Sequence, residues 1–354
     1  MQFQRGDTIG LYRIDGVLGS GGMGRVYKVQ HTVTGRVEAL KVVLRKGSSG
    51  AERTKRFFQE VRTQASMNHP GVPAVHNAFW EGDALVVAME LIEGQSLEKL
   101  IKERPISLSE GLDYVFQVLD VLSHVHEKHV VHRDVSPGNI MVGWDGKIHL
   151  TDFGLAKVTT EERASEAGMV MGAVYYMSPE QVRGDASIDQ RTDTYSLGVV
   201  LYELLTGRKP FEGDNHYAIM RAHVDQEPAS PMDINPTISP ALSRAISTAI
   251  AKEPHRRFQS ASQFREALEK TKEGARQDAR NPTSMWGGIS GAFQNLLPAP
   301  APVANNDRLA VILARSSSAP CEVSSRPGPA SLPPALRGLA STLSGLSRSA
   351  RSDS

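Results

Sequence analysis

The stretch "HRDVSPGN", residues 132–139, decides how this chain is interpreted. It places Asp134 five residues before Asn139 in a segment without a helix or strand pattern. An aspartate and an asparagine at this spacing in one loop are typical of phosphoryl transfer assisted by a metal ion. Two positions after the aspartate, where a lysine would help to hold a phosphate, the chain carries Ser136. The loop therefore predicts a site that handles phosphate, and it leaves open whether that site is complete.

Composition excludes several classes of protein. The 354 residues include 40 basic and 39 acidic side chains, so the charge predicts neither a nucleic-acid binder nor a membrane-surface binder. Cys321 is the only cysteine, which excludes an intrachain disulfide and favours a reducing compartment. The first residues lack the pattern of a signal peptide, and the run "LAVILA" at 309–314 is far shorter than the roughly 20 residues of a membrane span. We therefore expect a cytoplasmic protein without a membrane span.

The composition changes near residue 270. Residues 8–270 alternate patterned segments with turns, which predicts one domain with a first lobe at about 8–92 and a second at about 93–270. Residues 271–354 are rich in proline and serine and bury too little apolar surface to offset chain entropy, so we expect a disordered tail. This tail is either a solvated end or a tether. A tether would use a short amphipathic anchor formed by Trp286, Ile289, Phe293, Leu296 and Leu297.

The domain begins with strand patterns and continues with helix patterns. The β-rich runs are "YRIDGVLG", "GRVYKVQ", "RVEALKVV" and "ALVVAME", and one helix, "AERTKRFFQEVRTQASM", interrupts them. From about residue 96 the periodicity is helical, and "RTDTYSLGVVLYELLTG" is so apolar that it predicts a buried helix ending at Gly207. The short runs "NIMV" and "KIHL" flank Asp145–Gly146, which predicts a tight hairpin. These patterns predict an α+β fold with a small β-rich lobe and a larger helical lobe.

A glycine-rich segment, "LGSGGMGRV", lies between the first two strand patterns. It sets Gly19, Gly21 and Gly24 before Val26, and this spacing lets backbone N–H groups approach phosphate oxygens without obstruction by Cβ atoms. A strand rather than a helix follows, which argues against a dinucleotide-binding fold, and the Gly-Lys-Ser/Thr ending of a P-loop is missing. Taken alone, the motif also fits a plain turn.

Lys41, on the next strand pattern but one, strengthens the phosphate interpretation. Its neighbours on both sides are apolar, so it lies on a strand that is predicted to be buried, where an unpaired ammonium would be costly. It therefore needs an anionic partner. The candidates are Glu60, on the following predicted helix, and the phosphates of a bound nucleotide. The alternative is a lysine on a solvated strand edge.

Further motifs follow in order and at fitting separations: "HRD" at 132–134, Asn139, "DFG" at 152–154, "SPE" at 178–180, "DTYSLG" with Asp193 and Gly198, and "HRRF" with Arg257. Together with the glycine loop, Lys41 and Glu60, this series resembles the eukaryotic-like serine/threonine protein kinases of bacteria. The resemblance runs from about Tyr12 to Leu268. It implies the bilobal protein-kinase fold, ATP as cofactor, and protein substrates, with possible self-association for trans-autophosphorylation.

The resemblance also implies a role for each matching residue. Asp134 would orient the substrate hydroxyl and accept its proton. Lys41, positioned by Glu60, would hold the α- and β-phosphates. Asn139 and Asp152 would hold Mg²⁺, with Mn²⁺ as the alternative metal, because both offer the oxygen ligands that magnesium prefers.

The nucleotide pocket follows from the same matches. Met89 would gate the space behind adenine, and the backbone from Glu90 to Ile92 would hydrogen-bond adenine. The predicted ATP-binding residues are Leu18, Gly19, Ser20, Gly21, Gly22, Met23, Gly24, Arg25, Val26, Ala39, Lys41, Met89, Glu90 and Ile92.

Other matches imply support and regulation. Glu180 and Arg257 would form a buried ion pair beneath the "SPE" segment, and Asp193 would brace the catalytic loop. Arg133 resembles the arginine that pairs with a phosphorylated residue of the activation segment. The candidate phosphorylation sites are Thr159, Thr160 and Ser165, with ordinary loop hydroxyls as the alternative interpretation.

Four histidines, at 124, 126, 129 and 132, crowd into nine residues and raise the alternative of a metal site. His124 and His126 are two apart, so on a helix they point in different directions. His132 belongs to the "HRD" motif, where the resemblance implies a packed core residue. We therefore do not expect these histidines to bind a metal.

Two positions depart from the family pattern. Ser136 replaces the usual lysine, and Ala173 replaces the usual threonine of the segment leading to "SPE". These two residues normally contact each other and the catalytic aspartate, so their joint absence indicates a single change. Two hypotheses remain: an active serine/threonine kinase with an altered phosphate clamp, and a nucleotide-binding pseudokinase that acts as a scaffold or switch. The presence of Lys41, Asp134, Asn139 and Asp152 favours the active kinase.

Overall fold

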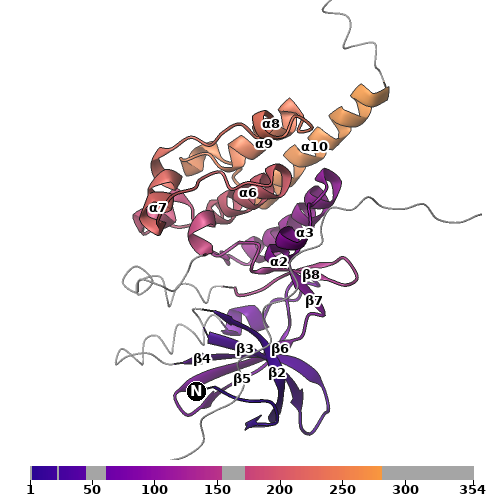
Figure 1. Cartoon of the computed structure of the whole chain (residues 1–354), viewed down its shortest axis with the longest axis vertical. Helices are drawn as coiled ribbons and strands as arrows, with labels where there is room; N and C mark the ends of the chain where they lie inside the picture. The colour runs from indigo at the N-terminus through magenta and orange to yellow at the C-terminus, as the bar shows by residue number, and fades with distance from the viewer. Residues whose placement is uncertain (1, 22–23, 45–60, 154–171, 281–354) are drawn as a thin grey trace, which may run out of the picture. The chain divides into compact units, whose positions relative to one another are not determined.

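A computed structural model of the chain describes residues 2–21, 24–44, 61–153 and 172–280 (Figure 1). Several residues singled out above lie outside these ranges. They are Gly22, Met23, Glu60, Thr159, Thr160, Ser165 and the hydrophobic side chains of the tail. For Ser20, Gly21 and Ala173 the backbone is described and the side chain is not.

The first half of the described chain is an antiparallel sheet with strand order β1-β2-β3-β4-β6-β5. Its strands are β1 (Thr8–Ile9), β2 (Tyr12–Gly21), β3 (Gly24–His31), β4 (Val37–Leu44), β5 (Val75–Glu81) and β6 (Ala84–Glu90). The four strand patterns of the sequence form β2, β3, β4 and β6, which confirms that prediction. β1 and β5 were not predicted.

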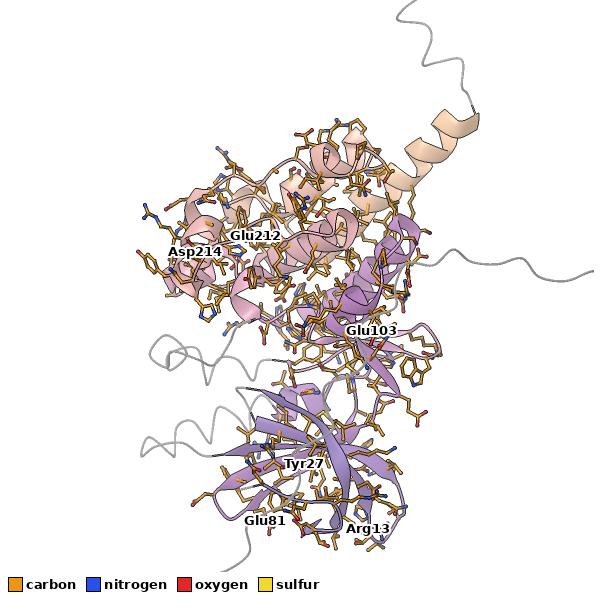
Figure 2. All side chains as sticks on the ribbon, viewed as in Figure 1. Arg13, Tyr27, Glu81, Glu103, Glu212 and Asp214 are labelled. Carbon is orange, nitrogen blue, oxygen red and sulfur yellow. The ribbon has the colours of Figure 1, made fainter. Side chains whose placement is uncertain are left out.

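Side chains alternate between the two faces of this sheet, as successive strand residues do. One face forms an apolar cluster around Tyr27, Leu40 and Val86, and Figure 2 shows Tyr27 among the strands. The other face forms a second cluster that contains Ala39, Met89 and Val61. The second cluster covers the side of the sheet on which Val26 also packs.

Residues 61–65 are the described part of the helix predicted between β4 and β5. Val61 is buried, as its apolar periodicity suggests, whereas Ala65, four residues later, is exposed. The apolar face of this helix therefore does not extend to its last turn.

The second half is mainly helical (Figure 1). Its helices are α2 (Leu97–Glu103), α3 (Leu108–Glu127), η1 (Ala173–Tyr176), α5 (Pro179–Arg183), α6 (Arg191–Thr206), α7 (His216–Asp225), α8 (Pro231–Ile234), α9 (Pro240–Ala249), η2 (Pro254–Arg256) and α10 (Ala261–Arg280). Several of these helices begin after a serine: the hydroxyls of Ser96, Ser107, Ser178 and Ser239 accept hydrogen bonds from backbone N–H groups of the first turn.

Helix α6 lies in the middle of the helical half and is buried from Thr192 to Leu205. It ends at Gly207, whose φ of 69° is the left-handed conformation that glycine adopts without a Cβ penalty. Close packing is required at Gly198, where an added Cβ would lie 2.7 Å from the Cβ of Ala249 on α9. The predicted buried helix is therefore confirmed, together with its end.

A small sheet, β7-β8-β9, joins the two halves of the domain. It consists of β7 (Gly94–Ser96), β8 (Ile140–Gly143) and β9 (Ile148–Leu150). The turn between β8 and β9 has Gly146 at φ 79°, which confirms the hairpin predicted at Asp145–Gly146. Because Ile140 pairs with Leu150, the residues on either side of the hairpin, Asn139 and Thr151, lie next to each other.

Helix α10 continues past residue 270, where the sequence pattern placed the end of the domain, to Arg280. The part of α10 up to Lys272 packs on α3, where Arg265 and Lys272 lie over the ring of Phe116. Within the described ranges, no helix combines the length and the apolar character needed to cross a membrane.

Candidate active site

Lys41 and Asp152 are brought together although they are 111 positions apart in the chain. Lys41 lies on β4 and is only 3% exposed, and Asp152 follows β9 by two residues with a φ of 65°. The Nζ atom of Lys41 lies 2.6 Å from Oδ1 of Asp152. An unpaired ammonium at this depth would be costly, so the lysine has the anionic partner that its burial requires.

The predicted adenine-binding residues lie on one face of the first sheet. Ala39 pairs with Met89 across β4 and β6, and Val26 pairs with Lys41 across β3 and β4. Ala39 and Met89 belong to one apolar cluster, and Val26 packs against it. Ile92 is half-buried in the segment that leads out of β6. The apolar wall and the lysine therefore lie on neighbouring strands.

The glycine-rich segment forms the connection between β2 and β3, with Gly21 paired to Gly24. Gly24 has a φ of 138°, and a Cβ there would lie 2.1 Å from the carbonyl oxygen of Val42, so only glycine fits. At Gly19 a Cβ would meet nothing within 4 Å. The first glycine is therefore not required by packing inside the chain, and it leaves room above the strand for a ligand. Leu18 is half-exposed beside it, and Arg25 is half-buried.

Asp134 and Asn139 contact each other inside the catalytic loop. The side-chain nitrogen of Asn139 donates to the carbonyl oxygen of Asp134 at 2.8 Å and to its Oδ2 at 3.0 Å. The backbone oxygen of Asn139 accepts from the amide of Thr151 at 2.9 Å. These bonds hold the carboxylate of Asp134 beside the chain that leads to Asp152.

Asn139 and Asp152 fit a magnesium ion by the chemistry of their donor atoms. Because Asn139 uses its side-chain nitrogen for Asp134, its amide oxygen is left as a ligand atom, and Asp152 offers a carboxylate. Proteins hold Mg²⁺ through one or two such groups together with phosphates and waters. The described ranges contain no group of three or more His, Cys, Asp or Glu side chains suited to a metal. The two residues therefore suit an ion that arrives with a nucleotide.

Asp193, in the first turn of α6, accepts hydrogen bonds from the backbone of the catalytic loop. Its Oδ2 accepts from the backbone amide of His132 and its Oδ1 from that of Arg133, both at 2.8 Å. The ring Nε2 of His126, on α3, lies 2.8 Å from the same Oδ2. Arg133 has a φ of 66°, which is strained for a residue other than glycine and costs on the order of 1–3 kcal/mol. The buried carboxylate of Asp193 therefore supports a strained turn next to Asp134.

Three of the four histidines, His124, His126 and His132, contact other side chains or backbone groups of the protein. The Nε2 atom of His132 lies 2.9 Å from the carbonyl oxygen of Thr151, and its ring packs against Phe153 with centroids 4.7 Å apart. The ring of His124 lies beside that of His69, 5.1 Å between centroids. Burial is the main reason, and the neighbouring His124 a second one, that the pKa of His69 is lowered. His129 is exposed and follows the end of α3 with a φ of 58°.

Glu180 and Arg257 form a buried ion pair beneath the "SPE" segment. The guanidinium donates to both carboxylate oxygens, at 2.7 and 2.8 Å, and the hydroxyl of Thr192 donates to Oε1 at 2.6 Å. Burial alone would raise the pKa of Glu180, but the hydrogen bonds and charge of Arg257 outweigh burial, and the pKa is lowered. The carboxylate is therefore held ionised in the interior.

Sequence reasoning did not assign a role to Gln181 or to His126. Gln181 reaches the catalytic loop from α5, where its Nε2 donates to the carbonyl oxygen of Arg133 at 2.8 Å. His126 was considered only as a metal ligand, and it binds Asp193 instead. Both contacts join segments that are far apart in the chain, so no spacing in the sequence signals them.

Comparison with known proteins identifies relatives of this domain. A family model described as "Protein kinase domain" matches residues 12–270. The chain is 34% identical over 253 residues to the serine/threonine-protein kinase PrkC of Bacillus subtilis, covering 71% of this chain and 39% of PrkC. It is 36% identical over 274 residues to the serine/threonine-protein kinase PknA of Mycobacterium tuberculosis, covering 75% of this chain and 62% of PknA. The chain thus spans less than two thirds of the length of these relatives.

Solved structures agree with the sequence relatives. The crystal structure of the kinase domain of Mycobacterium tuberculosis PknI superposes with a TM-score of 0.61 at 27% identity. The superposition covers 76% of this chain and 99% of the PknI chain. The kinase domain of PknI is therefore similar to this chain in its small β-rich part and its larger helical part.

Proposed function

Because this chain belongs to the protein kinase domain family, we propose that it transfers the γ-phosphate of ATP to serine and threonine hydroxyls of proteins, including its own. The observation that carries this proposal is the 2.6 Å contact of Lys41 with Asp152 in the same site as the Asp134–Asn139 pair. The backbone bond from Thr151 to Asn139 supports the pairing of these contacts in one site, and the named relatives are serine/threonine-protein kinases.

Each residue has a role that its surroundings support. Asp134, held by the amide of Asn139, orients the substrate hydroxyl and accepts its proton. Lys41 binds the α- and β-phosphates, and Glu60 is proposed as its second partner. Members of the family use ATP and a divalent cation, which neutralises charge on the phosphates when it is bound. We assign Asn139 and Asp152 as its ligands, with Mg²⁺ as the metal and Mn²⁺ as the alternative.

The nucleotide is proposed to bind between the glycine-rich segment and the apolar wall of Val26, Ala39 and Met89. Adenine contacts this wall and bonds the backbone from Glu90 to Ile92. The open space at Gly19 accommodates the phosphates. The remaining proposed contacts come from Leu18, Ser20, Gly21, Gly22, Met23, Gly24 and Arg25.

Protein substrates are favoured by the buried support of the "SPE" segment. The Glu180–Arg257 pair fixes α5 to the helical half, and α5 follows η1, on which a peptide would lie. Arg133 supports regulation by phosphorylation, because its Nε atom is buried and bonds no other residue in the described ranges. An anion would satisfy it, and we propose phosphorylated Thr159, Thr160 or Ser165 as that anion.

We further propose that the protein acts in the cytoplasm and associates with itself for trans-autophosphorylation. Residues 8–270 are proposed as the kinase domain, extended by the rest of α10, and the segment that follows as a disordered tail.

Incubation of the purified protein with labelled ATP and Mg²⁺, and in parallel with Mn²⁺, tests the proposal. Label should appear on serine or threonine, and Asp134→Asn should abolish it. Incorporation that survives Asp134→Asn would contradict the role of Asp134. If the wild type binds ATP but incorporates no label under either metal, the protein is a nucleotide-binding scaffold and the proposed function is wrong.

A further inference from the structure

The peptide group between Arg133 and Asp134 is held at both ends. Its N–H, which belongs to Asp134, donates to Nδ1 of His132 at 3.2 Å. Its carbonyl oxygen, which belongs to Arg133, accepts from Nε2 of Gln181 at 2.8 Å. The orientation of this peptide group fixes the direction in which the side chain of Asp134 leaves the backbone. The strained φ of Arg133 means that the group has a more relaxed orientation available.

Gln181 makes two different bonds with the two ends of its side-chain amide. Its Oε1 accepts from the backbone N–H of Ser178 at 3.0 Å, which completes the capping box at the start of α5. Its Nε2 donates to the carbonyl of Arg133, 48 residues earlier in the chain. A flipped amide would place oxygen against oxygen and nitrogen against N–H, so the observed orientation satisfies both partners. The amide oxygen therefore caps α5, and the amide nitrogen hydrogen-bonds the catalytic loop.

Among the described residues, Gln181 is the one whose side chain hydrogen-bonds the carbonyl that precedes Asp134. Ala173 has no polar side-chain atom, so it cannot hydrogen-bond Asp134, and Ser136 carries no charge. Asp193 holds the amides of His132 and Arg133, but it does not reach the carbonyl that precedes Asp134. In the described part of the chain, the side chain of Gln181 is therefore what holds the carbonyl of Arg133.

We propose that Gln181 is a positioning residue, which aims Asp134 by holding the carbonyl of Arg133 and so ties the placement of α5 to the catalytic loop. This inference rests on the proposed kinase function. A misplacement of about 1 Å at a reacting group costs roughly 10²-fold in rate. Loss of the bond should therefore lower kcat by roughly ten- to a hundredfold and leave the KM for ATP nearly unchanged.

Gln181→Glu isolates this bond in the full-length protein. The carboxylate still accepts from Ser178, but at neutral pH it cannot donate to Arg133. Its pKa should lie above the usual value of about 4.3, because a carbonyl oxygen faces it. Protonation restores a donor, so kcat relative to wild type at the same pH should be low at pH 8 and recover toward pH 5.5. The matched control is Gln190→Glu, because Gln190 also donates from Nε2 to a backbone carbonyl, that of Gln259, at 2.7 Å.

A second measurement does not depend on turnover. Amide hydrogen exchange of a peptide that spans residues 130–139 should be faster in Gln181→Glu than in wild type at pH 8 and unchanged in Gln190→Glu. If the wild type has no kinase activity but exchange is still faster in Gln181→Glu than in wild type, the positioning inference holds and the proposed function is wrong. If exchange is unchanged, and kcat is equal to wild type or shows the same ratio at pH 8 and pH 5.5, Gln181 only caps α5 and the inference is wrong.

Discussion

Both terminal nitrogens of the Arg257 guanidinium donate hydrogen bonds to the carboxylate of Glu180, although the two residues are 77 positions apart in the chain. The same guanidinium donates to the backbone carbonyls of Ala251, Arg191 and Lys252, so all its donor groups are used. Its Cζ atom also lies 4.7 Å from the ring centroid of Tyr195. This cation is therefore satisfied on every side within the protein interior.

Arg257→Met should destabilise the protein by about 3–5 kcal/mol, because it leaves the carboxylate of Glu180 buried without its partner. The free energy of unfolding from urea titration is the measurement. Arg265→Met is the matched control, since Arg265 pairs with Asp120 and Glu269 at a partly exposed position. That substitution should cost less than about 1 kcal/mol. Equal losses of unfolding free energy in both variants would show that the buried pair stabilises the protein no more than the exposed pair.

The stability contributed by Glu180 should depend on pH in a defined window. Its pKa is lowered in the folded state, so the contribution is complete above the ordinary value of 4.5. It is lost as the pH falls through the lower folded value, because protonation then discharges the partner of Arg257. The free energy of unfolding should therefore fall more steeply below pH 4.5 in wild type than in Glu180→Gln. Parallel pH curves for the two proteins would contradict the lowered pKa.

Lys41→Met should lower kcat/KM for ATP by roughly 10²–10³-fold, the usual effect of removing one preorganised electrostatic contact. The matched control is Lys28→Met, because Lys28 lies on the neighbouring strand β3 with an exposed side chain. Steady-state phosphorylation of a protein substrate measures both. A similar loss in the control would mean that the sheet, rather than the lysine charge, was damaged.

Ser136→Lys should raise kcat and leave the KM for ATP nearly unchanged. A lysine there would place positive charge at the transferring phosphate, where charge shifts in the transition state. The gain is bounded by roughly 10²–10³-fold. Ala173→Thr should raise kcat further. The two substitutions together should give more than the sum of their separate free-energy effects, because the two new side chains would share a hydrogen bond. If both substitutions slow a wild type that is already fast, another group supplies this charge.

A nearby carboxylate, that of Glu98, competes with the phosphate for a lysine at position 136. A Cβ built on Gly138 would lie 3.6 Å from Oε2 of Glu98 and 3.9 Å from the hydroxyl of Ser136. The carboxylate of Glu98 and the hydroxyl of Ser136 thus both lie around Gly138, so the long side chain of a lysine at 136 reaches this carboxylate, which attracts the ammonium away from the phosphate. Ser136→Lys should therefore gain more activity when it is combined with Glu98→Gln. Glu98→Gln alone serves as the control for this pair.

A chain that ends after Arg280 should unfold in one cooperative step and phosphorylate itself at the rate of the whole chain. The reason is that α10 ends there, and the proline- and serine-rich composition of the residues that follow predicts a disordered tail. A chain that ends at Lys270 should lose about 1 kcal/mol of stability, because it lacks the contacts of Lys272 with Asp113 and with the ring of Phe116. Thermal melting and autophosphorylation rates compare the three lengths. Slower autophosphorylation of the Arg280 chain would show that the tail contributes to catalysis.

Much of the fold could be predicted because apolar residues repeat with the period of each element. β6 and α6 are apolar runs with clear ends, and both are present. β5 was missed because its residues, "VHNAFWE", are half-exposed without strict alternation. The last turns of α10 were missed for a related reason, since "KEGARQDAR" has no apolar periodicity to mark it as helix.

The candidate site could be predicted only where residues follow one another in short motifs. Asp134 and Asn139 lie in one loop, so their proximity is readable from the sequence. The bond from Gln181 to Arg133 joins two segments through a single backbone carbonyl, and any residue could supply that carbonyl. Likewise, nothing in the spacing of His126 indicates that it turns toward Asp193. Such contacts depend on tertiary packing, which no local pattern encodes.

Asp193 takes its position from α6, a helix whose side chains are almost all enclosed. The catalytic loop is therefore aligned to the interior of the helical half rather than to a surface loop. In genetic terms, conditional alleles should be found far from the nucleotide. Random mutagenesis followed by selection at two temperatures is expected to recover temperature-sensitive mutants at α6 positions such as Gly198, where Ala249 leaves no room for a side chain. Mutants at Asp134 should be null at both temperatures.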